Sequence, residues 1–354
     1  MHFDHGTIPE EYTRYLNRKY IFLGCLFAGL LVALVAAVSF GAAVIPLDKL
    51  FSAFLEDGTS RRYEMIVWNI RLPQAVIALV AGAGLACSGA VMQCILRNPL
   101  GSPFTLGISH AAAFGAAFAV MVLDQGSMTS TGGISVNNPY VTTGCAFAFS
   151  LLAAGAIIGV SRLRTVTPEV MVLTGVALSA LFTAGTMLLQ YFADDVQLAA
   201  MVFWTFGDTG RADWAEVLLM TIVTVTLVGY FLSNCWKYNA MEAGDETAQS
   251  LGVRVGRVRL TGMMAASLLT AVLISFLGII GFVGLVVPHM IRRVLGADHR
   301  FLLVGCVLCG GGLLLVSDTV ARLILSPHVL PVSVLTAFMG APIFIYLIIQ
   351  GGRR

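Results

Sequence analysis

The sequence predicts an all-α integral membrane protein with about ten spanning helices, and composition is the first reason. Hydrophobic residues make up 58% of the chain and charged residues only 11%, against roughly 45 to 50% and about 25% in soluble domains. Since a spanning helix needs about 20 apolar residues, the 354 residues leave room for roughly ten spans. We therefore expect one transmembrane domain over residues 1–354, and the net charge of +2 gives no reason to expect a nucleic-acid partner.

The pattern of apolar runs and flanking charges is the second reason. Residues 1–19 are too long and too acidic for the charged region of a cleavable signal, so they are predicted to form a cytoplasmic N-terminal segment before a retained span. The predicted spans, of which the eighth is short, lie at 20–41, 72–96, 104–123, 141–160, 169–191, 214–235, 259–280, 282–295, 301–321 and 331–350.

The distribution of basic residues is the third reason and gives the orientation. With the N-terminus inside, 15 of the 21 Lys and Arg residues fall on the cytoplasmic side and 6 outside. The opposite orientation would invert this ratio, so both termini are predicted to be cytoplasmic. The six outer cations are Lys49, Arg61, Arg62, Arg71, Arg211 and Arg322.

Small residues recur within several spans, as at Gly82, Gly89 and Gly310. In lipid such residues allow helix backbones to approach closely. The stretch from Gly278 to Pro288 predicts a sharp turn on the outer side, followed by a span kinked at the proline.

Residues 236–258 form the only long polar interval in the second half of the chain, and we call them the coupling segment. One small, smooth helix face is predicted from the spacing of Ala240, Gly244, Ala248 and Leu251. Most acidic residues, including Glu242 and Glu246, fall on other faces, and Gly252 predicts the helix end. A short cytoplasmic helix between two spans is suited to receive a push from a soluble partner, although an ordinary connecting loop is the alternative.

Few ionisable residues lie within spans, where such residues by default suggest function. Asp318 and Arg322 stand four apart, a spacing that allows a local ion pair. His289 follows Pro288, and its alternative role is to bond a carbonyl that the proline frees.

No motif for catalysis, nucleotide or metal appears in the sequence. Seven cysteines lie almost entirely in apolar runs, and the Cys306-x-x-Cys309 pair has no second ligand pair beside it, so no metal site is expected. A Gly-x-x-x-x-Gly-Lys-Ser/Thr loop is absent, as is any Ser, His and acid set that a helix would bring together. We expect a transporter rather than an enzyme.

Four stretches, in this order, make the chain resemble a known family. They are RLPQAVIALVAGAGLACSGAVMQCILRNPLGSP with the following FTLGISHAAAFGAA (71–117), MEAGDETAQSLGV (241–253), GFVGLVVPHMIRRVLGADHR (281–300), and SDTVAR (317–322) with LPVSVLTAFMGAPIFIYLI (330–348). The chain resembles the permease subunits of binding-protein-dependent ABC importers for ferric siderophores, haem and cobalamin.

The resemblance implies partners and residue roles. It implies a homodimer or pseudodimer of ten-span subunits in a bacterial or archaeal cytoplasmic membrane, a cytoplasmic ATPase pair that binds the ATP and Mg²⁺, and an outer substrate-binding protein. Arg71 and Arg322 match arginines that dock the binding protein. The residues implied to contact the ATPase are Glu242, Gly244, Glu246, Ala248, Leu251 and Gly252.

The chain also departs from the family pattern. Gln74 replaces the second arginine of the Arg-Leu-Pro-Arg motif, Val329 replaces an acidic residue, Ser333 a glycine, and Asp208 a serine. These departures affect mainly the expected docking of the binding protein.

Two other function classes remain open. An ion-coupled secondary transporter would need several acids within its spans, and Asp318 alone is thin support for one. An intramembrane enzyme would need paired catalytic groups at mid-span, and only His289 qualifies. The sequence leaves the transported chelate open.

Overall fold

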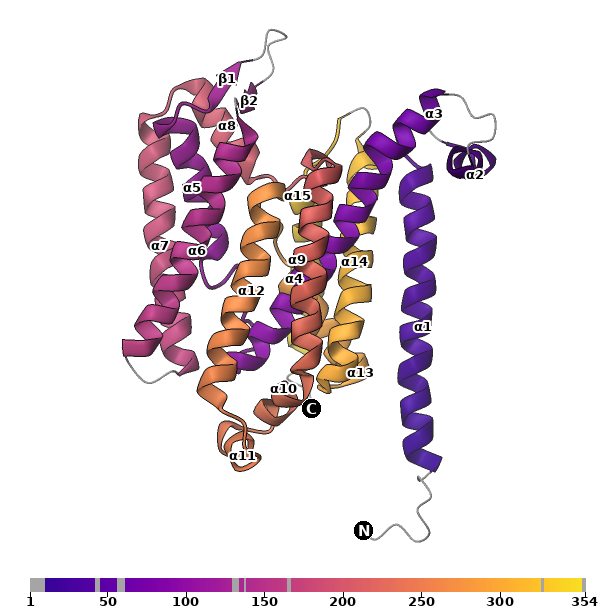
Figure 1. Cartoon of the computed structure of the whole chain (residues 1–354), viewed down its shortest axis with the longest axis vertical. Helices are drawn as coiled ribbons and strands as arrows, with labels where there is room; N and C mark the ends of the chain where they lie inside the picture. The colour runs from indigo at the N-terminus through magenta and orange to yellow at the C-terminus, as the bar shows by residue number, and fades with distance from the viewer. Residues whose placement is uncertain are drawn as a thin grey trace.

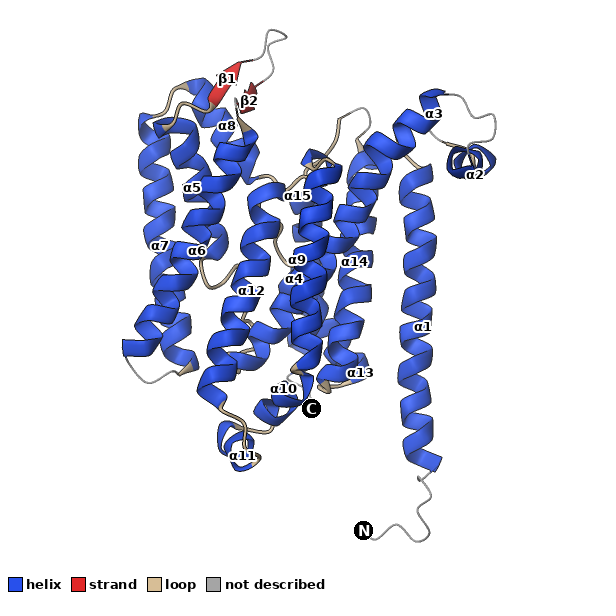
Figure 2. Ribbon diagram, in the orientation of Figure 1, coloured by secondary structure: helices blue, strands red, loops and turns tan. Residues whose placement is uncertain are grey.

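A computed structural model describes residues 10–41, 45–55, 61–128, 134–136, 138–163, 167–325 and 328–351. These residues form a bundle of long helices, with one short hairpin of strands at one end (Figures 1 and 2). The all-α prediction is confirmed apart from this hairpin, in which β1 (Gly126–Met128) pairs antiparallel with β2 (Ile134–Val136).

A helix matches each of the ten predicted spans to within a few residues, apart from the start of the first. These are α1 (Glu10–Ser39), α4 (Leu72–Ile95), α5 (Ile108–Val122), α6 (Pro139–Leu163), α7 (Pro168–Phe192), α9 (Trp214–Ser233), α12 (Val255–Leu277), α13 (Val283–Leu295), α14 (His299–Ile324) and α15 (Val332–Gly351). Within the described ranges, seven helices are long and apolar enough to cross a membrane. The other three are α5 and α15, whose apolar stretches are shorter, and α13, which has only 13 residues.

The N-terminal boundary differs from the prediction. Helix α1 begins at Glu10, so the second half of the predicted segment 1–19 is helical and continuous with the first span. The charged and tyrosine-rich residues at its start do not interrupt a helix, because their side chains can extend into solvent. Residues 1–9 lie outside the described ranges.

Helix α4 is the centre of the bundle. In its most apolar window 89% of the residues are buried, compared with 11% for α7. It packs against α14, α12, α13 and α9 (Figure 1). Close approach depends on paired glycines, since a Cβ on Gly82 would lie 2.2 Å from the carbonyl oxygen of Gly310 and one on Gly89 would lie 1.7 Å from that of Gly284. The predicted role of small residues in backbone packing is thereby confirmed.

Several short elements were not expected from hydropathy. They are α2 (Leu47–Leu55), α3 (Arg61–Ile66), a π-helical stretch at Val67–Arg71, α8 (Asp195–Thr205) and a 3-10 turn at Thr209–Arg211. All of them lie at the end of the bundle where α3 and the hairpin are seen (Figure 1). They are too short to give a spanning signal, which is why apolar length alone missed them.

The turn between α12 and α13 is confirmed, with Pro288 inside α13. Gly278 ends α12 with φ 80°, and Phe282 precedes α13 with φ 65°. A side chain on Gly278 would also meet the carbonyl oxygen of Trp204 at 2.7 Å. This is a close contact that only glycine permits.

The coupling segment is not a single helix, contrary to the prediction. Helix α10 (Cys235–Glu242) ends before Gly244, whose φ of 119° no helix allows, and α11 (Asp245–Ser250) begins in a new direction. The even spacing of small residues suggested one continuous helix, but glycine at the break permits a left-handed backbone conformation.

Candidate functional site

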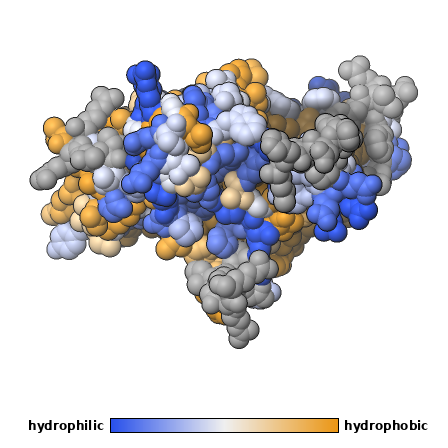
Figure 3. Space-filling model, turned by 90° about the horizontal axis from the view of Figure 1, so that it is seen from below, coloured by the Kyte–Doolittle hydropathy of each residue, from blue (hydrophilic) through white to orange (hydrophobic). Residues whose placement is uncertain are grey.

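The coupling segment lies at one end of the bundle, where α1 begins and α14 starts (Figure 1). Viewed from this end, hydrophilic residues gather in the middle of the surface, with apolar residues around them (Figure 3). This end therefore offers a polar face to an aqueous partner.

The predicted coupling residues do not share one face. Ala248 is completely buried against its own chain, whereas Leu251 is 68% exposed. Glu246 is also exposed. Gly244 and Gly252 have positive φ angles, 119° and 80°, and so form the two turns that bound α11. The smooth small face is thus a wrong expectation, because the break at Gly244 turns Ala248 inward while Leu251 points outward.

Asp245 ties α11 to the bundle through two arginines. The Nη2 of Arg259 in α12 lies 2.9 Å and 3.2 Å from the two carboxylate oxygens of Asp245. The Nη1 of Arg97 lies 3.9 Å from one of the same oxygens. The Arg259 side chain is only 3% exposed, and its Nε donates to the carbonyl oxygen of Ile95 at the end of α4 at 2.8 Å. One buried guanidinium therefore joins α11, α12 and α4.

Glu242 makes a second connection. Its carboxylate forms an ion pair with Arg292 in α13, and both side chains are partly exposed. Gln93 of α4 donates in turn to the carbonyl oxygen of Leu285 in α13 at 3.1 Å. The coupling segment is thus joined by charge pairs to α12 and α13, and through them to α4.

Sequence reasoning missed Asp245 and Arg259 as a pair. They are fourteen residues apart and lie in separate helices, so no helical spacing brings them together. The one available signal was an arginine at the start of an apolar span, Arg259, which must find a partner if it is buried.

The two arginines predicted to dock a binding protein, Arg71 and Arg322, are buried within the chain. Arg71 is 4% exposed and donates to the carbonyl oxygens of Val38, at 3.1 Å, and Phe40. Arg322 is 9% exposed and donates to the carbonyl oxygen of Ala37 at 3.2 Å. Both cations thus satisfy carbonyls at the C-terminal end of α1, where a positive charge is favourable. Within this chain, both arginines therefore hold the end of α1.

Asp318 completes this cluster. It lies 3.1 Å from the Nε of Arg322, which confirms the local ion pair. It also accepts hydrogen bonds from the hydroxyl of Thr209 and from the Nε2 of Gln74, the latter at 3.2 Å. Gln74, the departure from the family motif, therefore has a defined role in holding the carboxylate.

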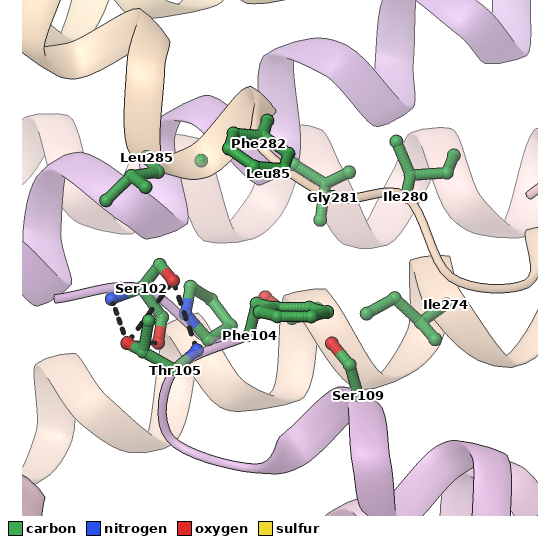
Figure 4. Close-up of a pocket in the computed structure, with 13 residues that line it drawn as sticks. Leu85, Ser102, Phe104, Thr105, Ser109, Ile274, Ile280, Gly281, Phe282 and Leu285 are labelled. Carbon is green, nitrogen blue, oxygen red and sulfur yellow. Dashed lines mark hydrogen bonds between the residues drawn. The ribbon is translucent and has the colours of Figure 1, made fainter. Parts of the chain in front are cut away.

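A small apolar cavity lies beside α4, α12 and the connection from α4 to α5 (Figure 4). Its volume is about 200 Å³, and Phe104, Ile274, Ile280 and Phe282 are among the residues that line it. Pockets that hold drug-sized ligands are about 300 to 1,000 Å³, so this cavity is too small for a bulky chelate. In this conformation it can take only a small apolar group.

One group of side chains near the coupling segment could hold a metal. The Sγ of Cys94, a carboxylate oxygen of Glu242 and a ring nitrogen of His299 all lie within 4.8 Å of one another. No spacing in the sequence indicated this group, because the three residues come from α4, α10 and α14. His289, in contrast, lines a neighbouring polar cavity with Glu242 and Arg292.

Comparison with known proteins agrees with this architecture. Residues 29–350 match the model of the FecCD transport family. An ABC transporter permease protein of Methanocaldococcus jannaschii is 51% identical over 98% of this chain and 99% of its own length. The hemin transport system permease of Yersinia pestis is 34% identical over 93% and 96%, and the vitamin B12 import system permease of Yersinia pseudotuberculosis is 33% identical over 95% of each chain.

A solved structure supports the same assignment. A metal-chelate type ABC transporter in an inward-facing conformation superposes with a TM-score of 0.81 and 29% sequence identity, covering 93% of this chain and 99% of the other. Sequence and fold thus agree over nearly the whole chain, which belongs to the FecCD transport family of ABC transporter permeases.

Proposed function

We propose that this chain is the membrane permease of a binding-protein-dependent ABC importer for a metal chelate, with ferric siderophore as the first candidate and haem and cobalamin as the others. The ten helices matched to the predicted spans form the domain within the cytoplasmic membrane of a bacterium or archaeon, and both termini are cytoplasmic. The position of α1 supports this topology, since its first residues lie at the same end of the bundle as α10 and α11 (Figure 1). Binding and hydrolysis of ATP with Mg²⁺ belong to a partner subunit.

The coupling segment is the observation that carries the proposal. It is polar, lies at one end of the bundle, and is joined to α12 and α13 through Asp245 and Glu242. A force applied to α11 by a soluble partner would therefore reach the helices that pack around α4. An ordinary connecting loop would not need a buried arginine to hold it.

Contact with the ATPase is assigned to the exposed part of the segment. Leu251 offers an apolar contact and Glu246 a charged one, while Glu242 is shared with Arg292. Gly244 and Gly252 shape the turns and Ala248 supports α11 from within. Replacing Gly244 by tryptophan would strain the backbone whatever the partner does, so Leu251→Asp is the cleaner test of contact.

The environment of Asp318 disfavours the alternative, an ion-coupled transporter. A carboxylate that carries protons or sodium must gain and lose its ion during transport. Asp318 is instead held by Arg322, Thr209 and Gln74. These contacts suit a fixed structural charge.

A second copy and lipid are the proposed neighbours within the membrane. Only 11% of the residues in the most apolar stretch of helix α7 are buried. The helix exposes large side chains such as Leu173, Leu181 and Met187. So much apolar surface must be covered by lipid or protein. A homodimer would cover part of it and create a pathway between two chains, wider than the apolar cavity of about 200 Å³ inside one chain.

Docking of an outer binding protein by Arg71 and Arg322 stays a proposal. Because both cations hold the end of α1, reversing their charge would disturb the fold as well as the docking. A charge-reversal test therefore needs a control cation that does not hold other parts of the chain. Arg211 does not qualify, since it donates to the carbonyl oxygens of Phe203, Trp204 and Phe206. Arg61, which is exposed, is the better control.

The deciding experiment is uptake by vesicles that contain the chain, its ATPase and its binding protein. We expect uptake of ferric siderophore, haem or cobalamin only when ATP is present on the side of the membrane that carries the ATPase. The Leu251→Asp variant should remain folded but lose uptake. Uptake driven by a proton or sodium gradient without ATP would instead establish the secondary transporter.

A further inference from the structure

We propose that Cys94, Glu242 and His299 form a zinc site where the coupling segment meets α4 and α14. The three residues offer a thiolate, a carboxylate and an imidazole, and their ligand atoms all lie within 4.8 Å of one another. This departs from the sequence expectation of no metal site, and it concerns a resident ion rather than the transported chelate.

The hydrogen bonds of His299 determine which ring nitrogen carries the proton. Its Nδ1 lies 3.1 Å from the Oδ1 of Asn239, and its backbone N–H donates to the same oxygen at 2.7 Å. The Nδ2 of Asn239 donates to Asp298 at 2.9 Å, which fixes the orientation of the amide. Nδ1 must therefore carry the proton and donate, so Nε2 keeps its lone pair free to bind a metal.

His299 is buried, and its second ring nitrogen lacks a partner. The residue is 0% exposed, and Nε2 has no hydrogen-bond partner among the residues that the structure describes. A buried acceptor without a partner is destabilising, because it has lost its hydrogen bond to water and gained none in return. A metal ion would satisfy it, and the hydrogen bond from Nδ1 to an amide oxygen is the kind of outer contact that orients metal-binding histidines.

The other two ligands are already oriented toward this point. The Sγ of Cys94 lies 3.5 Å from the carbonyl oxygen of Tyr238 in α10, which brings the thiol to the same helix as Glu242. Glu242 is held by Arg292, and a carboxylate can keep one oxygen on an arginine while the other binds a metal. The three ligands come from α4, α10 and α14, so a bound ion would tie the coupling segment to both long helices.

The ligand types select zinc. Sulfur and imidazole nitrogen with one carboxylate suit Zn²⁺ far better than Mg²⁺ or Ca²⁺, which prefer oxygen ligands. Tetrahedral zinc, with bonds of about 2.0 to 2.3 Å, needs ligand atoms about 3.3 to 3.8 Å apart, so even the widest pair of ligand atoms in the group needs to close by no more than about 1.5 Å. On binding, the S–H bond of Cys94 breaks, the sulfur binds Zn²⁺, and the proton leaves to water.

A polar cavity supplies access and a place for a fourth ligand. It has a volume of about 300 Å³ and is lined by Cys94, Glu242, Gln93 and Arg97, among others. This is ample room for a water molecule, which would complete the tetrahedron. Zinc and the displaced proton can pass through the same cavity.

X-ray absorption at the zinc edge tests the site on the intact, untagged chain. The purified protein is stripped with a chelator and loaded with one equivalent of Zn²⁺. We expect a shell with one sulfur and the remaining ligands nitrogen or oxygen. A shell without sulfur, or with more than one, overturns the proposal.

Variants locate the sulfur. Cys94→Ser should remove the sulfur from the zinc shell, whereas the matched control Cys309→Ser, a half-buried cysteine of α14 outside the group, should retain it. If Cys94→Ser does not fold, Glu242→Gln at a partly exposed position replaces it and should weaken zinc binding by at least about tenfold, since even outer contacts of metal ligands account for 10- to 100-fold. Unchanged zinc affinity in Glu242→Gln, or loss of the sulfur in Cys309→Ser, contradicts the assignment. Neither measurement needs an ATPase or a transported chelate, so failure here leaves the proposed permease function untouched.

Discussion

Replacing Asp245 by asparagine should loosen the coupling segment without unfolding the bundle. Asp245 accepts two hydrogen bonds from the buried Arg259, at 2.9 Å and 3.2 Å. Asparagine has nearly the same shape but no charge. The variant therefore keeps the packing of α11 and removes the attraction that holds it to α12.

The magnitude follows from the kind of contact. Hydrogen bonds to charged groups contribute about 1.5 to 3 kcal/mol, and the upper end is limited here because the Asp245 side chain is 30% exposed. Since each 1.4 kcal/mol is a factor of ten, the open form of α11 should become roughly 10- to 100-fold more populated.

Hydrogen exchange measures this population directly. The backbone N–H groups of Ala248 and Val253 are bonded within the segment, to Gly244 and Ala248 respectively. Both should exchange roughly 10- to 100-fold faster in Asp245→Asn, while amides of α4 should be unchanged. In vesicles, ATP hydrolysis should continue with reduced uptake.

Glu246→Gln is the matched control. It makes the same change of charge in the same helix, at an exposed side chain with no ion pair in the described part of the chain. The pairing with Arg259 would not stabilise α11 if the Ala248 and Val253 amides exchanged equally fast in the two variants. The same conclusion would follow if Asp245→Asn exchanged as slowly as the unmodified protein.

Two predictions concern the bundle itself. Gly89→Ala should lower the free energy of unfolding by at least about 1 to 3 kcal/mol, because the new methyl group meets a backbone carbonyl at 1.7 Å, whereas Gly159→Ala, with nothing within 4 Å, should be neutral or stabilising. Equal thermal unfolding of these two variants in detergent would contradict the close packing of α4. Arg322→Gln should cost about 3 to 5 kcal/mol, since it leaves Asp318 buried without its cation, while the exposed Arg61→Gln should stay within about 0.5 kcal/mol. Unchanged stability of Arg322→Gln would return that arginine to docking alone.

Hydropathy alone was enough to place the spanning helices. Apolar length and flanking charge place helices such as 72–96 and 214–235 within two residues of α4 and α9, because a helix in lipid must satisfy its own backbone and so requires a continuous apolar run. Paired glycines likewise indicated close helix packing, and the four ordered motifs indicated the family. These features are local, or depend on composition, and can be seen in one dimension.

Contacts between distant segments could be decided only by the tertiary structure. Spacing suggested that Ala248 and Leu251 share a surface, but the left-handed backbone at Gly244 separates them. The outer position of Arg71 was predicted from its place in the chain, while its burial depends on the end of α1, 33 residues earlier. The pairing of Asp245 with Arg259, and the meeting of Cys94, Glu242 and His299, join helices that hydropathy treats as independent. A periodic pattern shows which face of a helix is apolar, but the partner of a polar side chain depends on which helix end packs beside it.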